Sequence, residues 1–232
     1  MIINITPKKT LLRLLGFIVF LLSANLCAII MKYYYNHDSF FGLVPLFNFD
    51  VEQNIPTFYS AIALMLCSIL LLIIALTHKK QSAPWLSWAG LAIIFLFLSI
   101  DEFASIHEGL IDPVRDTLGT SGFLYFAWVI PYGIALMLFL ALYTKFLIRL
   151  PQHFAFLFIL SGSIFVTGAI GLELIGGNQV ESHGINNITY SLISTCEEFL
   201  EMLGIVIFIY TLLLYITTEI DGVSINIRSK EQ

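Results

Sequence analysis

Six long apolar segments dominate the sequence, and they constrain the fold more than any other feature. We place them at residues 11–31, 57–77, 84–106, 123–148, 153–175 and 188–217. A helix of about 20 apolar residues crosses the hydrocarbon core of a bilayer, and a chain in lipid must satisfy its backbone polar groups internally. The sequence therefore predicts an all-α fold. We expect a polytopic membrane protein with one six-transmembrane-helix bundle over residues 1–232, ending in a short cytoplasmic tail at 218–232.

The composition favours a single membrane domain without a soluble one. Hydrophobic residues make up 58% of the chain and charged residues only 12%, whereas soluble domains are about 25% charged. The first segment follows Lys8, Lys9 and Arg13 and lacks a clear cleavage site, so we expect a retained helix rather than a removed signal peptide. We find no phosphate-binding glycine loop and no basic surface for nucleic acid, so we expect no nucleic-acid partner.

The basic residues divide unevenly between the two sides of such a bundle. If the six helices alternate in direction, one side carries Lys8, Lys9, Arg13, Lys79, Lys80, Lys145, Arg149, Arg228 and Lys230, and the other carries only Lys32 and Arg115. Cytoplasmic loops of membrane proteins are enriched in Lys and Arg. We therefore expect both termini in the cytoplasm and the protein in the cell's inner membrane.

Seven carboxylates lie within or at the ends of three of the apolar segments, and those three segments contain no Lys or Arg to pair with them. They are Asp101, Glu102, Glu108, Glu173, Glu197, Glu198 and Glu201. A charged side chain at the bilayer centre costs at least ~2.5–3.5 kcal/mol, so such residues face a protected interior. In the predicted topology they occupy the outer parts of three helices. We expect them to converge in one pocket that opens on the extracytoplasmic side.

The end of the third segment allows two arrangements. If the helix continues through Glu108, then Asp101, Ser105 and Glu108 share one face, because positions i, i+4 and i+7 stack. If it unwinds near Ser105, His107 also turns inward. A third interpretation leaves His107 and Glu108 in the hydrated headgroup layer.

The sixth segment carries the densest acidic cluster. Glu197, Glu198 and Glu201 fit within one 100° arc of a helix, together with Ser194 and Tyr190 one and two turns earlier. Three carboxylates this close cannot all stay charged without a cation. The alternative is a protonated, hydrogen-bonded cluster that only joins helices.

Glu173 closes the fifth segment and is harder to orient. Ser163, Thr167 and Gly171 recur every four residues, a spacing that lets membrane helices approach closely. Glu173 lies about 160° around from Gly171, the next member of the Thr167 stripe, so this small-residue stripe does not direct it toward the other acids.

Two loops are candidates for the rim of the pocket. Asp50, Glu52 and Asn54 alternate as in the first ligand positions of a calcium loop, but the later ligands are missing. The preferred interpretation is a helix cap at Asn54. The glycine-rich stretch 176–184 predicts a mobile lid that carries His183, although an isolated loop histidine is more often only solvated.

Three segments resemble a known group of sequences. They are Asp50-x-Glu52-x-Asn54-x-Pro56-Thr57, Asp101-Glu102-x4-His107-Glu108 and Glu197-Glu198-x2-Glu201-Met202-x-Gly204. Together they are similar to a family of uncharacterised bacterial multi-pass inner-membrane proteins, over residues 50–205. That family has no assigned activity, so the resemblance implies membership and no mechanism.

These patterns favour a metal-dependent membrane enzyme, a hydrolase or an oxidoreductase. Carboxylates with one histidine suit Fe, Mn, Mg or Ca, and we expect a lipid-like or small apolar substrate drawn from the membrane lipids. We assign acid or base chemistry to Glu102, Glu108 and Glu198; metal binding to Asp101, His107, Glu173, Glu197 and Glu201; and the rim to Asp50, Glu52, Asn54, His183, Tyr190 and Ser194. The alternatives are a cation- or proton-coupled transporter or channel, and a non-catalytic accessory protein.

Overall fold

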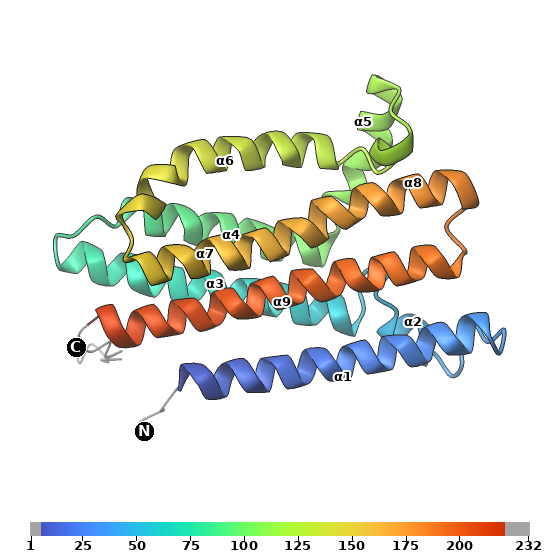
Figure 1. Ribbon diagram of the computed structural model, residues 1–232, viewed down its shortest axis with the longest axis horizontal. Helices are drawn as coiled ribbons and strands as arrows, with labels where there is room; N and C mark the ends of the chain where they lie inside the picture. The colour runs from blue at the N-terminus through green and yellow to red at the C-terminus, as the bar shows by residue number, and fades with distance from the viewer. Residues whose placement is uncertain (1–5, 221–232) are drawn as a thin grey trace, which may run out of the picture.

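The computed structural model describes residues 6–220, and every regular element among them is helical (Figure 1). Six spans are long and apolar enough to cross a membrane, as predicted: α1 (Pro7–Tyr33), α3 (Ile55–Lys80), α4 (Leu86–Ala104), α6 (Val129–Arg149), α9 (Ile188–Glu219), and one rod made of α7 (Gln152–Val166), the π-helical η3 (Thr167–Leu172) and α8 (Glu173–His183). Shorter elements are α2 (Leu43–Phe47), η1 (Glu108–Leu110), α5 (Ile111–Leu118) and η2 (Gly122–Leu124). Residues 221–232, most of the predicted tail, lie outside the described residues.

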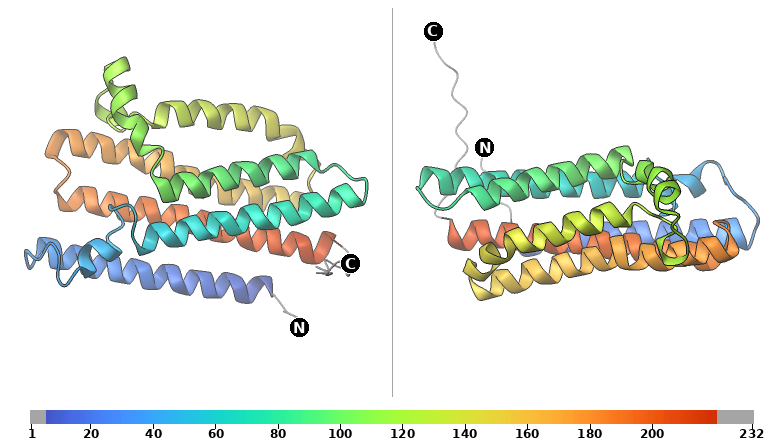
Figure 2. Two further views of the ribbon diagram at one scale, coloured as in Figure 1. Left: turned by 180° about the vertical axis from the view of Figure 1, so that it is seen from behind. Right: turned by 90° about the horizontal axis from the view of Figure 1, so that it is seen from above.

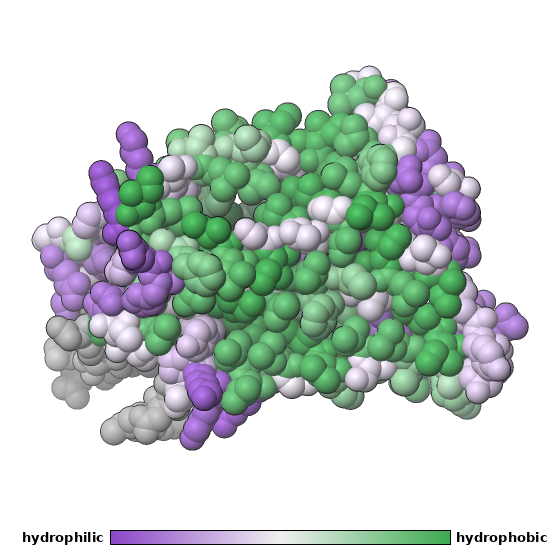
Figure 3. Space-filling view, in the orientation of Figure 1, coloured by the Kyte–Doolittle hydropathy of each residue, from purple (hydrophilic) through white to green (hydrophobic). Residues whose placement is uncertain are grey.

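The six spans run up and down, so the bundle has two chemically different ends (Figures 1 and 2). The basic end is where α1 begins and where α3, α6 and α9 finish; it carries Lys79, Lys80 and Arg149. The acid end is formed by residues 34–54, 105–128 and 184–187. In Figure 3, hydrophilic side chains gather at both ends and apolar side chains cover the surface between them. This distribution suits a protein embedded in a membrane.

Helix α9 is the centre of the bundle, because it packs against α1, α3, α7 and α8. It crosses α7 closely at Gly204, where an added Cβ would lie 2.8 Å from the Ser161 carbonyl oxygen and 2.8 Å from the Phe165 nitrogen. Glycine at this position lets two backbones touch, as small residues do in membrane helices generally.

The half of the bundle toward the basic end is filled by one apolar core. Leu71, Trp88, Phe154, Phe158 and Ile209 are among its buried members, and they come from α3, α4, α7 and α9. The buried side chains of this core are almost all apolar.

Buried hydrogen bonds hold the acid end of α1 to α9. The Asn25 side chain donates to Thr195 Oγ1 over 2.8 Å and accepts from the Phe49 backbone nitrogen at 3.0 Å. At the last residue of α1, a hydrogen bond of 2.9 Å joins Tyr33 to Ser191. These bonds fix the chain that enters the loop before α3.

The prediction of a glycine-rich lid at 176–184 is wrong, because α8 continues as a helix through His183. Gly176 and Gly177 serve close packing instead of loop flexibility. An added Cβ would lie 3.4 Å from the Tyr190 ring at Gly176 and 3.3 Å from the Phe126 ring at Gly177.

Candidate carboxylate and histidine site

Helix α4 unwinds where the second of the two expected arrangements requires. The helix ends at Ala104, and Ser105 follows with φ of 51°, in the left-handed region. The chain then turns back, so that the His107 backbone nitrogen donates to Asp101 Oδ1 over 2.8 Å and His107 Nδ1 lies 3.4 Å from the same oxygen. Buried Asp101 therefore orients His107, as carboxylates commonly do behind a metal-binding histidine.

Hydrogen bonds of the Asn54 side chain hold the loop before α3 together. Asn54 Oδ1 accepts hydrogen bonds from the Thr57 nitrogen and hydroxyl, at 3.2 Å each, and its amide donates to the Asn48 carbonyl over 2.6 Å. The predicted helix cap is thus confirmed. The Asn54 side chain is occupied by these backbone bonds, while the loop that it holds presents Asp50 and Glu52.

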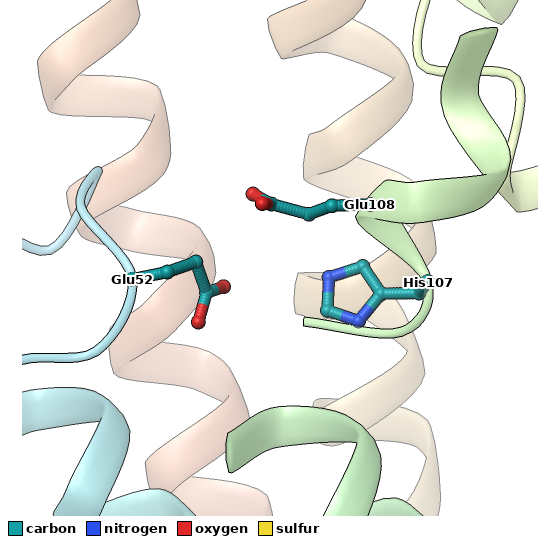
Figure 4. A group of neighbouring side chains, drawn as sticks. All are labelled: Glu52, His107 and Glu108. Atoms are coloured by element: carbon teal, nitrogen blue, oxygen red, sulfur yellow. The ribbon is translucent and has the colours of Figure 1, made fainter. Parts of the chain in front are cut away.

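Glu52, His107 and Glu108 form a compact group at the acid end, and we call it the His107 group. Their ligand atoms all lie within 4.8 Å of one another. Figure 4 shows Glu52 reaching across from the loop before α3 toward the two residues that follow α4. Oxygen donors lie about 2.0–2.1 Å from Mg and about 2.3–2.6 Å from Ca. Donors on opposite sides of one ion are thus up to roughly 4–5 Å apart, so this spacing can hold a divalent cation.

Burial and neighbouring charges shift the titration of this end. Burial raises the pKa of Glu52 to about 7, and the charge of Glu108 adds to the effect. Burial also raises the pKa of Asp50 to about 6, against hydrogen bonding from Tyr190 and the charge of Lys32. For His107, burial favours the neutral ring, but the hydrogen bond and charge of Asp101 together with the nearby glutamates outweigh it and raise the pKa.

Five half-buried carboxylates lie further into the bundle, and we call them the deep acids: Glu102 of α4, Glu173 of α8, and Glu197, Glu198 and Glu201 of α9. Glu102 lies close enough to Glu198 and Glu52 for their negative charges to interact. Glu201 lies similarly close to Glu102 and Glu173. The structure therefore brings acids from three helices and the His107 group into one connected set.

A π-helical turn brings Glu173 into this set. The backbone of α9 passes so close to η3 that a Cβ on Gly168 would lie 2.7 Å from the Glu197 carbonyl oxygen. A π turn inserts a residue, so the side chains after it emerge at a different angle from those of a regular helix. As a result Glu173 accepts a 2.6 Å hydrogen bond from Trp128 Nε1 and lies within hydrogen-bonding reach of Glu197.

Trp128 is the residue that sequence reasoning missed. It is buried just before α6, donates to Glu173, and its ring centroid lies 4.8 Å from that of His107. One side chain thus contacts both the His107 group and the deep acids. Its only sequence signal is a tryptophan at the start of an apolar segment, a pattern that usually indicates an interfacial anchor.

Of the other residues expected at the rim, Tyr190 and Ser194 are buried and His183 is exposed. Tyr190 is buried and its hydroxyl donates to Asp50, and Ser194 is buried one turn further along α9. His183 is exposed at the end of α8. The structure does not bring His183 into the His107 group.

Most of the chain matches the model of a known protein family. The model of a family described as a domain of unknown function, DUF8692, matches residues 11–216. The chain belongs to this family. The DUF8692 match includes the His107 group and all the deep acids. Neither the curated proteins nor the solved structures give a match.

Proposed function

We propose that this protein is a metal-dependent membrane enzyme, a hydrolase or an oxidoreductase, that acts on a lipid-like or small apolar substrate. The observation that carries the proposal is the His107 group, three ligand atoms within 4.8 Å of one another with the deep acids behind them. Anionic side chains in a membrane bundle need a counter-charge. Among residues 6–220 the two ion pairs are His107 with Asp101 and Arg115 with Asp112, so a bound cation is the simplest counter-charge for the rest.

The donor set favours a hard or borderline divalent ion. Two carboxylates and one imidazole suit Fe, Mn, Mg or Ca better than a thiolate-seeking metal. The Oε2 atom of Glu52 is buried and has no hydrogen-bond partner among the described residues. A buried acceptor without a partner calls for an explanation, and a cation at the His107 group provides one.

The chemistry then follows from the position of each group. A bound divalent ion would lower the pKa of a coordinated water or polarise a substrate oxygen. Glu52, His107 and Glu108 would hold the ion, and Asp101 keeps the His107 ring in place. Glu102 and Glu198 of the deep acids, which lie further inside the bundle, would accept or return a proton during the reaction.

An apolar hollow beside the site supports a substrate that enters from the bilayer. It has a volume of about 590 Å³ and is lined by Leu46, Gln53, Asn54, Ile55, Thr57, Phe58, Phe103 and Ala104. Two of the lining residues, Gln53 and Phe103, are the sequence neighbours of Glu52 and Glu102. Phe58 and Phe103 are themselves exposed, as expected for side chains that face acyl tails.

A one-sided pocket fits an enzyme better than a transporter or channel, since a pathway needs polar residues through both halves of a bundle. The half toward the basic end is filled by the apolar core, and within residues 6–220 the acid on that side is Glu219, at the last position of α9. We place the basic end, with both termini, in the cytoplasm. The acid end would then face the extracytoplasmic side of the inner membrane.

Metal analysis of the protein purified in detergent tests the proposal. After loading with divalent ions and desalting, we expect stoichiometric metal in the wild type and none in a Glu52→Gln, Glu108→Gln double variant. The control is Asp116→Asn with Glu219→Gln, which removes two exposed acids at opposite ends. Equal metal content in the two double variants, or none in the wild type together with an unchanged melting temperature on adding ions, would leave the accessory role as the better account.

A further inference from the structure

A second pocket at the acid end is separate from the carboxylate site. It has a volume of about 540 Å³ and is lined by Lys32, Tyr33, Asn36, Asp38, Val44, Pro45, Asn48, Val51 and Asn186. These residues come from the end of α1, the loop after it, α2 and the turn between α8 and α9. The volume falls within the usual range for small-molecule pockets, roughly 300–1,000 Å³.

The pocket carries one positive and one negative side chain, Lys32 and Asp38, which do not form an ion pair with each other. Lys32 lies in the last turn of α1, where the helix dipole favours a cation, and its Nζ lies 5.2 Å from the centroid of the Tyr33 ring. Asp38 supplies the one carboxylate of the lining. Within residues 6–220, neither Lys32 nor Asp38 belongs to an ion pair. The charge of Lys32 also acts on nearby Asp50, but no direct contact occupies its ammonium group, so both side chains can meet a ligand.

The walls of the pocket are already held in place. Tyr33 is fixed by its hydrogen bond to Ser191. Buried Asn48 accepts a hydrogen bond from the Asp50 nitrogen through Oδ1 at 3.2 Å, and its carbonyl accepts from Asn54. The side-chain amide of Asn48 is left to donate to a ligand. A pocket that is ordered before binding loses little conformational entropy when it is filled.

We propose that this pocket binds the headgroup of a zwitterionic phospholipid that carries a primary amine. The phosphate pairs with Lys32 and the Asn48 amide, and the ammonium donates hydrogen bonds to Asp38. The pocket lies where the apolar span of α1 ends, which is the depth of lipid headgroups. A quaternary ammonium is bound best by an aromatic cage, and here the single aromatic ring of the lining, Tyr33, already carries Lys32 above it.

This ligand is independent of the proposed metal chemistry, because none of the lining residues belongs to the His107 group or the deep acids. The two sites are nevertheless connected through the loop before α3, since Asn48 lies in the pocket and Glu52 lies four residues later. A headgroup held by Lys32 would anchor a lipid beside the site that we propose acts on apolar substrates.

Native mass spectrometry of the detergent-purified protein tests this inference with lipids that share acyl chains but carry ethanolamine, choline or glycerol headgroups. We expect the wild type to retain the ethanolamine lipid about tenfold more than the choline lipid, because charge-assisted hydrogen bonds are lost on methylation. Lys32→Gln should lower retention of all three lipids. Asp38→Asn should remove the preference for ethanolamine over glycerol without abolishing binding.

Matched controls separate pocket binding from general charge effects. Lys145→Gln and Asp116→Asn remove single exposed charges elsewhere and should leave retention unchanged. Lys32→Arg keeps the charge and should retain the lipid, which guards against misfolding as the cause of a loss. Equal retention of the three lipids by the wild type, the same retention in Lys32→Gln and Lys145→Gln, or displacement by soluble phosphoethanolamine at the lipid's own concentration would overturn the proposal.

Discussion

The two halves of this bundle share helices but bury opposite kinds of side chain. Toward the basic end, α3, α4, α7 and α9 bury large apolar side chains against one another. Toward the acid end, α4, α9 and the rod that continues α7 bring carboxylates together, and burying such charges opposes folding unless they are neutralised. The apolar half therefore supplies stability that offsets the cost of burying carboxylates in the acid half.

The largest effect should come from breaking the apolar half. Phe154 is completely buried at the start of α7, and Phe154→Ala should cost about 3–5 kcal/mol through the lost contacts and the cavity that remains. Thermal unfolding in detergent measures the loss. The metal content of the protein that remains folded should be unchanged. Loss of metal without a lower melting temperature would show that the two halves are not separated in this way.

A smaller effect, confined to the acid half, should follow from Gly168→Ala. The added Cβ would meet the α9 backbone at the Glu197 carbonyl oxygen, and overpacking of this kind costs about 1–3 kcal/mol. Because the clash pushes α9 away from η3, the affinity for divalent ions should fall as well. Gly162→Ala is the matched control, since nothing lies within 4 Å of the Cβ it would add. Equal behaviour of the two variants would contradict the role given to η3.

Trp128→Phe tests the connection inside the acid half. The substitution keeps an aromatic ring beside His107 but removes the hydrogen bond to Glu173, and an unsatisfied buried partner costs about 1–3 kcal/mol. We expect weaker binding of divalent ions and a fall in the melting temperature of a few degrees, about 2–4 °C for each kcal/mol lost. Trp85→Phe, near the basic end, is the control. In a protein where Trp85 and Trp88 are replaced by Phe, the fluorescence of Trp128 should respond to Mn; no response would argue against a metal within its reach.

These three tests also mark what the sequence can and cannot predict. Hydropathy predicted six spans, because bilayer thickness sets their length, and it placed the acids in one half of the bundle. It could not choose between the two arrangements after Asp101, since one left-handed residue at Ser105 decides which side chains turn inward. It likewise could not orient Glu173, because the π turn changes the angle that a regular helix predicts.

The sequence also could not predict the full role of Glu52. The sequence predicted only a rim position, since Glu52 lies in a loop more than 50 residues away from His107. Its place in the His107 group depends on the bonds of Asn54, which fold the loop back over the end of α4. Contacts between loops distant in sequence carry no periodic signal, so the pattern alone did not reveal this one.

The smallest expected effect concerns pH, and it sharpens the contrast between the halves because the buried members of the apolar core include no carboxylate. With its pKa raised from 4.5 to about 7, Glu52 keeps a proton in the folded metal-free protein that the unfolded chain has already released. The free energy of unfolding therefore falls as pH rises from about 4.5 to 7. The raised pKa of His107 acts in the same direction, because the stability gained from its charged form is present below pH 6.5 and is lost as pH rises through the folded value.

The melting temperature in the presence of a chelator should accordingly be higher at pH 5 than at pH 8. Divalent ions should raise it at pH 8, where Glu52 has lost its proton, and have little effect at pH 5. Glu52→Gln should flatten the dependence on pH, while Asp116→Asn, an exposed acid at the same end, should leave it unchanged. A melting temperature that rises between pH 5 and 8 without metal would mean that the charged carboxylates are stabilised by the protein itself, and the acid half would then need no cation.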